Sequence, residues 1–327
     1  MARILRQTTV VRDGWHNGFT DLQYWQGCYW VSYRKGASHA SLDGEAIISV
    51  SADRARFREV ARLHVPGDNR DPKMLPLNEQ RMALHFPSWT HGCAKHDLQH
   101  YLCFSDNGYE WSAPTPILPP RKWLWRIRPH GGRYYGLVQD LSGDWELGAP
   151  HQLELMVSDD LQEWKFVARI GEAFGLNESD IFWHEDGEAW IVARSVVKPE
   201  GSVFCSARPP YTDWQTTEMT PMVHAPIFVQ HAGELYVAGR SRPSVEGDTT
   251  FPFTTASVGI WRVTRGALEP VLRIPAIGDC SYPGLITDPE GRICLSYYSQ
   301  HAYHLGVVDF PQGISMPDDV YFAEIEL

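Results

Sequence analysis

The stretch NESDIFWHEDGEAWIVARS, residues Asn177–Ser195, contains two short apolar runs joined by an acidic, glycine-containing turn. The runs Ile181–His184 and Ala189–Ala193 have the length and residue types of strands, and the Glu-Asp-Gly between them is typical of a tight turn. The stretch therefore predicts a β-hairpin. Glu178 stands just before the first strand and Arg194 ends the second. An antiparallel hairpin places these opposite charges at the same open end, where we expect the functional site.

The composition of the 327-residue chain favours a large all-β domain. Its 43% hydrophobic and 21% charged residues are ordinary for a globular protein with a large core. The 13 Trp, 14 Tyr and 13 Phe, with 27 Gly and 23 Pro, suit many short strands and turns better than long helices. No segment keeps a helical period for more than a turn or two. We treat residues 1–327 as a single domain.

The net charge and the cysteine pattern limit which binding partners and which cellular compartment we expect for the protein. The net charge is −11 and no Lys/Arg block or basic helix occurs, which argues against nucleic acid and an anionic membrane as partners. The N-terminus lacks the apolar core of a signal peptide, and no apolar run is long enough to span a bilayer. We therefore expect a cytoplasmic protein. Its six scattered cysteines, with no CxxC pair, are expected to be buried free thiols.

A first repeated signature is a strand followed by Ser-x-Asp/Asn, with an aromatic residue six positions after the Ser. It begins at Ser51, Ser105 and Ser158, at intervals of 54 and 53 residues, and a degenerate fourth copy ends at Trp214. In such a turn the Asp or Asn side chain accepts hydrogen bonds from backbone amides, and the aromatic side chain packs between strands. We therefore expect these turns to be structural and to lie on the outer rim.

A second signature, a turn followed by an apolar strand, occurs six times. The copies start at Gly27, Asn78, Gly132, Gly187, Gly233 and Gly291. Six units in 327 residues give one unit per 54 or 55 residues, near the length of a four-stranded propeller blade. We predict a six-bladed β-propeller with four-stranded antiparallel blades. The last strand, Tyr321–Leu327, is expected to complete the blade begun by the N-terminus and to close the ring without a bare sheet edge.

The repeat register places two rings of polar side chains at the centre of the propeller. Seven residues after each turn start stand Arg34, His85, Gln139, Arg194, Arg240 and Tyr298, where strand packing predicts apolar residues. The preceding strands begin near His16-Asn17, Asn69-Arg70-Asp71, Trp125-Arg126, Glu178, His224 and Tyr282. Since a guanidinium grips a carboxylate bidentately, clustered arginines in an acidic protein indicate an anion site. The alternative is a network of inward ion pairs that holds the blades together.

At these residues the chain resembles the sialidase (neuraminidase) superfamily of six-bladed propellers. Its central hallmark is Asn-Glu, then an acidic-Gly turn and a strand ending in Arg, which Asn177-Glu178, Asp186-Gly187 and Ala193-Arg194 match. A second hallmark, Ser-Tyr-Ser/Pro at the start of the last blade, is matched by Ser281-Tyr282-Pro283. The degenerate Asp-box turns (BNR repeats) and the closing strand also look like that family, so the likeness spans almost the whole chain.

The resemblance implies a retaining exo-glycoside hydrolase that acts on an acidic sugar, sialic-acid-like or uronic, with a tyrosine nucleophile. Tyr282 would be the nucleophile and Glu178 the base that takes its proton, because a phenol with a pKa near ~10 attacks poorly by itself. The family's acid/base aspartate lies on a loop after the second strand of blade one. Asp43 is the positional match, and His39 on the same loop is a rival proton donor.

The arginines with which the family binds a substrate carboxylate are matched in part. No arginine stands at the start of blade one, in Trp15–Leu22, so Arg34 or Arg70 would supply that charge. Arg194 matches the second arginine, and Arg240 or Arg242 the third. The resulting set of expected substrate-binding residues is Arg34, Arg70, Arg126, Arg194, Arg240, His85, His224 and Tyr298. Trp123 and Trp125, beside Arg126, would form a stacking wall for a sugar or pack between blades.

Two other functions stay open. A propeller polysaccharide lyase acting on a uronate would use Tyr and His for β-elimination, and the histidines of the rings suit it. A non-catalytic glycan- or protein-binding propeller would not need Glu178 within hydrogen-bond distance of Tyr282.

We expect no cofactor and no catalytic metal. The candidate ligands His16, His39, His85 and His224 are far apart in the sequence. His91, His96 and His100 lie in one segment, and the last two have His-x3-His spacing, but no Glu motif stands nearby to complete a site.

Overall fold

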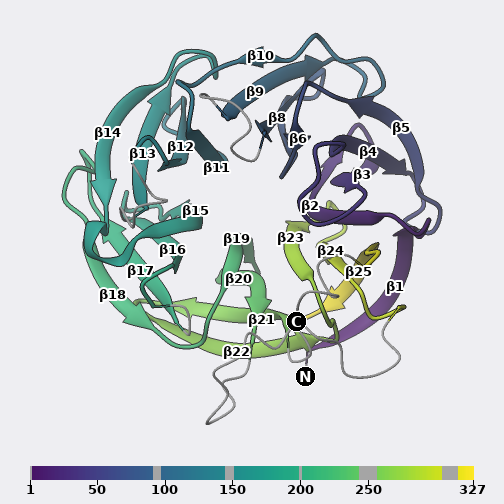
Figure 1. Ribbon diagram of the computed structural model, residues 1–327. Coiled ribbons are helices and arrows are strands. Elements are labelled where there is room, and N and C mark those ends of the chain that lie inside the picture. The colour runs from purple at the N-terminus through teal and green to yellow at the C-terminus, as the bar shows by residue number, and fades with distance from the viewer. Residues whose placement is uncertain (1, 91–96, 144–150, 199–200, 243–255, 304–315) are drawn as a thin grey trace.

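The computed structural model describes residues 2–90, 97–143, 151–198, 201–242, 256–303 and 316–327. In these residues six antiparallel sheets stand around a common axis, and the helical structure is the short 3₁₀ turn η2, Glu172–Phe174. Figure 1 shows the ring, with one strand of each sheet nearest to its centre. The predicted six-bladed β-propeller with four-stranded blades is confirmed.

Each blade runs from an innermost to an outermost strand. Blade one holds β2 (His16–Trp25), β3 (Cys28–Gly36), β4 (Glu45–Ser51) and β5 (Arg58–Leu63). In blade two the inner strand is split into β6 (Asp68–Asn69) and β7 (Lys73–Asn78), followed by β8 (Arg81–Trp89), β9 (Leu98–Ser105) and β10 (Thr115–Pro116). Blade three holds β11 (Lys122–His130), β12 (Arg133–Asp140), β13 (Gln152–Ser158) and β14 (Lys165–Ile170).

The second half of the ring repeats this order. Blade four holds β15 (Leu176–Trp183), β16 (Ala189–Ser195), β17 (Ser202–Ala207) and β18 (Gln215–Met219). Blade five holds β19 (His224–His231), β20 (Glu234–Ser241), β21 (Ser257–Thr264) and β22 (Ala267–Ile274). Blade six takes β23 (Cys280–Thr287), β24 (Ile293–Ser299) and β25 (Asp319–Glu326) from one end of the chain and β1 (Arg3–Val11) from the other.

The ring is closed by pairing between the two ends of the chain. β1 runs antiparallel to β25, from Arg3 opposite Glu326 to Val11 opposite Val320. The expected closure by the last strand is therefore confirmed. The N-terminal strand supplies the outer edge of a blade whose inner three strands come from the other end of the chain.

The three Ser-x-Asp/Asn turns share one hydrogen-bond pattern, as predicted. The side-chain Oδ1 of Asp53, Asn107 and Asp160 accepts two backbone N–H groups each, at 2.8–2.9 Å. The indoles of Trp111 and Trp164 donate to backbone carbonyls of the same turns. These turns join the third and fourth strands of blades one to three, so the side chains stabilise the outer part of the ring.

Apolar side chains fill the space between adjacent blades. Trp30 and Ile48 of blade one, for instance, share a buried cluster with Leu84 and Phe86 of blade two. The described cysteines are free thiols, four of them buried and Cys28 partly so, as the sequence predicted; Cys93 lies outside the described residues.

The innermost strands share a feature that the sequence did not predict, an irregularity near the start of each strand. The register of β2, β11, β15, β19 and β23 shifts there, and in blade two residues 70–72 separate β6 from β7. Four of these places hold a non-glycine residue at positive φ: Phe19 (58°), Asp71 (43°), Ala225 (48°) and Tyr282 (43°). Such strained residues gather at functional sites, and a bulge re-aims a side chain out of the strand alternation.

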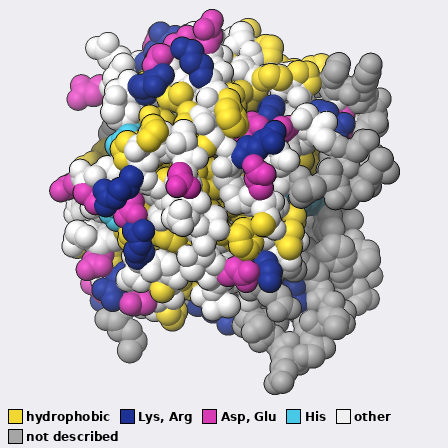
Figure 2. Space-filling view, turned by 90° about the vertical axis from the view of Figure 1, so that its left-hand side faces the viewer, with side chains coloured by type: hydrophobic (Ala, Val, Ile, Leu, Met, Phe, Trp, Pro, Cys, Tyr) yellow, Lys and Arg dark blue, Asp and Glu magenta, His cyan; other side chains and the backbone are white. Residues whose placement is uncertain are grey.

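The outer side of the ring carries charges of both signs close together, as Figure 2 shows for the side that is at the left in Figure 1. Exposed ion pairs such as Arg133–Asp159 and Arg208–Asp186 belong to this mixed surface. Among the described residues, no helix has the length and apolar character needed to cross a membrane.

Candidate active site

Glu178 and Tyr282 form the centre of the site. The Tyr282 hydroxyl donates a short hydrogen bond to Glu178 Oε1, which also accepts from Arg194 Nη1 at 2.7 Å. Glu178 Oε2 accepts the backbone N–H of Ala225 at 2.8 Å. The bulges of β15, β19 and β23 hold Glu178, Ala225 and Tyr282, so three blades build this one contact.

The surroundings give the two groups opposite protonation states. Burial by itself would raise the pKa of Glu178, but the charges of Arg194 and other basic groups, with the Tyr282 hydrogen bond, lower it to about 2. Burial, together with the negative charge of Glu178, raises the pKa of Tyr282 well above its ordinary value. At neutral pH the pair is therefore a carboxylate and a neutral phenol, the resting state of a base and a nucleophile.

Three guanidiniums surround the pair. Arg194 binds Glu178 directly, and the Arg240 guanidinium lies 5.3 Å from the centre of the Tyr282 ring. Arg70 lies over the ring of Phe19 at 4.3 Å, and that ring meets the Tyr282 ring edge-on at 5.0 Å. The structure thus brings Arg70, Arg194 and Arg240 to Tyr282.

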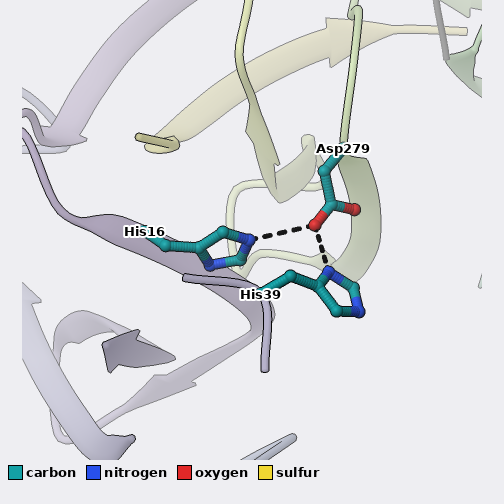
Figure 3. A group of neighbouring side chains, drawn as sticks. All are labelled: His16, His39 and Asp279. Carbon is teal, nitrogen blue, oxygen red and sulfur yellow. Dashed lines mark hydrogen bonds and ion pairs between the residues drawn. The ribbon is translucent and has the colours of Figure 1, made fainter. Parts of the chain in front are cut away.

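A second cluster adjoins the first on the blade-one side of Tyr282. Figure 3 shows His16 and His39 pointing at the same oxygen of Asp279. His16 Nε2 lies 3.0 Å from Asp279 Oδ2, and His39 Nδ1 makes a short contact with the same atom. The other oxygen of Asp279 accepts from the Tyr298 hydroxyl at 2.9 Å and from Arg240 Nη2 at 3.3 Å. The carboxylate of Asp279 is fully buried and held by four side chains.

This cluster is also the candidate metal site among the described residues. One ligand atom each from His16, His39 and Asp279 lie within 4.8 Å of one another. The existing hydrogen bonds account for the contacts without an ion, because each imidazole can donate a proton to Asp279. The cation-rich surroundings of Arg70 and Arg240 also disfavour a bound metal ion. His91 and His96, the other metal candidates, lie outside the described residues.

The tautomer of His39 follows from its two neighbours. Its Nε2 lies 3.3 Å from Arg70 Nη2, which can only donate, so Nε2 accepts and the ring proton is on Nδ1, directed at Asp279. Asp43, on the same loop, is exposed, and both of its carboxylate oxygens accept the backbone N–H of Ala37 at 3.2 Å. The structure brings His39 to the site and turns the Asp43 carboxylate toward its own loop.

Two of the ring arginines are deeply buried and fully engaged. Arg34 binds Asp68 at 2.6 Å and also the carbonyls of Ser38 and Ser41, which shapes the loop that carries His39. Arg126 donates to Asp21 at 3.1 Å and to the carbonyls of Pro226 and Pro283. Both act here as internal connections between chain segments, which is the ion-pair alternative set out for the rings.

The remaining ring residues are buried close to the site or beside it. His85 accepts a hydrogen bond from His100 at 3.0 Å, and because the Leu124 N–H already occupies the other His100 nitrogen, the His85 proton is on Nε2. Both ring nitrogens of His224 are buried without a hydrogen-bond partner in the described part of the chain. Burial lowers the pKa of His85 and of His224 well below the ordinary value, so both are neutral.

Three further residues of the site were not assigned a role from the sequence. Asp71 is buried, and burial raises its pKa to about 6 against the pull of Lys73 and Arg70. The negative charge of Glu178 also raises the pKa of Asp71, and that of Asp71 raises the pKa of Tyr282. No sequence pattern pointed to a role for Asp279 or Phe19, because neither stands at a repeated position. Asp71 could have been found, because it stands in the second polar ring.

A cavity of about 200 Å³ opens beside Glu178 and Arg194. Its walls include Trp89, Trp123 and Trp125, and the last two rings are stacked at 5.1 Å. The predicted aromatic wall therefore lines a hollow next to the Glu178–Tyr282 pair. Flat aromatic faces of this kind are suited to sugar rings.

Comparison with known proteins identifies the fold. No family model and no curated protein matches the sequence. Among solved structures, a protein of unknown function from Dyadobacter fermentans matches over 100% of this chain and 99% of its own, with a TM-score of 0.81 and 14% identity. The sialidase of Trypanosoma rangeli, in complex with the inhibitor DANA, matches over 98% of this chain with a TM-score of 0.69 and 13% identity. The chain has a sialidase-like fold.

The likeness covers only part of the longer neighbours. The chain spans 58% of the Trypanosoma rangeli sialidase and 69% of the endosialidase of phage phi92, which matches with a TM-score of 0.68 and 9% identity. At such identities the comparison establishes the six-bladed architecture, and the chemistry has to be argued from the side chains of this chain.

Proposed function

We propose that this protein is a retaining exo-glycoside hydrolase in which Tyr282 is the nucleophile and Glu178 its base. The observation that carries the proposal is the direct hydrogen bond from the Tyr282 hydroxyl to Glu178 Oε1. A purely structural role gives no reason to bury a carboxylate against a phenol at a strained, positive-φ position. A non-catalytic binding propeller would not need this pair.

The chemistry proceeds in two displacements. As Tyr282 Oη attacks the anomeric carbon, its proton passes to Glu178 Oε1, and the bond from that carbon to the leaving oxygen breaks while the oxygen receives a proton. Water then attacks the same carbon, the bond to Tyr282 breaks, and Glu178 returns the proton to the phenolate. Two inversions retain the configuration of the sugar.

His39 is the proposed donor of the proton to the leaving oxygen, and the acceptor of the proton from water in the second step. Its side chain is 29% exposed, so a leaving group that departs toward solvent can reach it, whereas Asp71 is almost fully enclosed. Asp279 accepts the Nδ1 proton and so orients the ring. To donate, His39 has to take up a second proton on Nε2, which requires that nitrogen to give up the hydrogen bond that it accepts from Arg70 Nη2. The alternative donor Asp43 would first have to leave the Ala37 amide.

The test compares three variants on a panel of chromogenic glycosides. Tyr282→Phe and Glu178→Gln are expected to lower kcat/KM on the order of 10³-fold or more, as loss of a nucleophile or its base does in other covalent enzymes. Tyr297→Phe is the matched control, because this buried tyrosine of the same blade has no partner for its hydroxyl among the described residues. Equal turnover by Tyr282→Phe and by the control would show that Tyr282 is not the nucleophile.

The product separates hydrolysis from elimination. Proton NMR during turnover should show the first-formed sugar with the configuration of the substrate. A uronate lyase would instead release an unsaturated product without taking up water. The Tyr282–Glu178 chemistry acts at the anomeric carbon, so it works in the same way on a sugar with the expected carboxylate and on one without it.

A further inference from the structure

The guanidiniums near Tyr282 are already bound to acidic side chains of the protein. Arg194 Nη1 is shared with Glu178 at 2.7 Å, and Arg70 Nη1 lies 3.1 Å from Asp68. A carboxylate bound at either arginine would have to share it with an anion already in contact. Such sharing costs free energy, because two like unit charges about 4 Å apart repel by ~4 kcal/mol at an effective dielectric constant of 20.

Arg240 is likewise engaged by an internal carboxylate, that of Asp279. Its Nε donates to the Cys280 carbonyl at 2.8 Å, and its Nη2 lies 3.3 Å from Asp279 Oδ1 and 3.2 Å from the Tyr298 hydroxyl. With His16 and His39 on the other oxygen, Asp279 is surrounded by donors as a bound substrate carboxylate would be. Of the three arginines near Tyr282, Arg240 is thus the one whose guanidinium meets this internal carboxylate in the described structure.

Phe19 stands at the start of blade one, where the sequence has no arginine. It holds the bulge position of β2 that Tyr282 holds in β23, and its ring packs edge-on against those of Tyr282 and Tyr298 at 5.0 and 5.6 Å. An apolar ring in this position adds no donor for an anion.

The polar atoms left free around the pair are of both hydrogen-bonding kinds. The buried, unpartnered atoms of the described site include donors, Arg70 Nε and Arg194 Nε, and an acceptor, Asp71 Oδ1. The His224 ring offers one donor and one acceptor. A carboxylate group only accepts and so cannot itself satisfy Asp71, whereas a hydroxyl in the same place both donates and accepts.

We propose that the sugar cleaved at this site is uncharged, with hydroxyl groups in the positions where an acidic sugar would carry its carboxylate. The inference rests on the proposed function and replaces the acidic substrate expected from the sequence. Asp279 is the residue that determines this specificity, by filling the anion position from within the protein.

The experiment uses aryl glycosides in matched pairs that differ only at C6, a glucoside with a glucuronide and a galactoside with a galacturonide, in both anomeric forms. Aryl fucosides, arabinosides and sialosides complete the panel. Each is assayed with the wild type and with Tyr282→Phe. The expected result is turnover that depends on Tyr282 and favours the neutral member, with kcat/KM at least about 10²-fold higher, a ratio worth ~2.7 kcal/mol.

The outcomes separate the inference from the function on which it rests. Turnover of uronides or sialosides that depends on Tyr282 and equals or exceeds that of the neutral sugars overturns the inference and leaves the proposed function standing. Turnover of neutral sugars that survives Tyr282→Phe overturns the proposed function. If the wild type turns over none of the neutral glycosides in a way that Tyr282→Phe abolishes, the inference is also refuted.

A second measurement concerns Asp279 itself. Asp279→Asn keeps the shape and removes the charge, so the ratio of acidic to neutral kcat/KM should rise about 10-fold even where both values fall. Asp318→Asn is the control for the contact with His16, since this buried carboxyl lies 3.0 Å from the same His16 nitrogen. It forms no ion pair with the three arginines at Tyr282 in the described structure, although its charge acts on Arg240. An unchanged ratio in Asp279→Asn would refute the role given to Asp279.

Discussion

Replacing Arg126 with methionine should destabilise the whole ring while leaving the sugar site in place. The guanidinium extends from β11 of blade three to Asp21 of blade one, at 3.1 Å, and to the carbonyls of Pro226 in blade five and Pro283 in blade six. It therefore connects four of the six blades. Methionine fills similar volume but satisfies none of these acceptors.

The magnitude follows from what is left behind. Asp21 is 1% exposed and would keep the Met74 N–H at 3.0 Å as its main donor. This buried carboxylate would lose its ion-pair partner and keep only the longer-range charges of Lys73 and Arg128. Removal of one partner from a buried ion pair costs about 3–5 kcal/mol. At about 2–3 °C per kcal/mol for a large domain, the melting temperature should fall by roughly 6–15 °C.

Urea unfolding and calorimetry would measure the effect against Arg133→Met. Arg133 and its partner Asp159 are 40% and 64% exposed, so that change should leave the free energy of unfolding nearly unchanged. Adding Asp21→Asn to Arg126→Met should restore part of the loss, because the unpaired charge disappears. If Arg126→Met is as stable as Arg133→Met and raises KM instead, Arg126 binds substrate and its bracing role is wrong.

Three further predictions concern single positions. The pKa of Asp71 is raised to about 6 from its ordinary 3.8, so its protonated form stabilises the folded state below pH ~4 and this contribution is lost as the pH rises through 6. Between pH 4 and pH 7, the free energy of unfolding of Asp71→Asn, measured in urea, should therefore rise by up to about 3 kcal/mol relative to that of the wild type. A difference that does not change with pH would contradict the raised pKa. Gly284→Ala should cost more than about 3 kcal/mol, since the new Cβ would lie 2.1 Å from a backbone nitrogen of β2; a wild-type melting temperature would disprove that contact. His39→Gln should reduce kcat about 10²-fold or more, whereas Asp43→Asn should change it less than about threefold; the reverse order in steady-state kinetics would make Asp43 the proton donor.

The propeller and the core of its site are encoded locally enough to be predicted. Each repeat carries its own turn and strand, so blade number follows from counting. Glu178 and Arg194 lie on neighbouring strands of one hairpin, and antiparallel pairing alone brings them together. Tyr282 was placed by resemblance, and the structure sets its hydroxyl against Glu178, 104 residues away in the chain.

Partners distant in the sequence could not be predicted. The ring register predicted that Arg34 and Arg126 point inward, but it did not predict the acids that bind them. Asp68 binds Arg34 from 34 residues away in the sequence, and Asp21 binds Arg126 from 105 residues away. Alternation along a strand determines the face on which a side chain lies and carries no information about which charge another blade places opposite it. Asp279 was missed for the same reason, since its contact His16 is 263 residues away.

The antiparallel pairing of β1 with β25 has a consequence for rebuilding the chain. Arg3 lies opposite Glu326, so the two ends of the polypeptide are adjacent, as Figure 1 also shows. A short linker joining them would allow new ends to be cut between any two blades, giving circular permutants in which every blade is continuous. The order in which such permutants lose activity on heating would show whether the blade assembled from both ends is where the native ring begins to open.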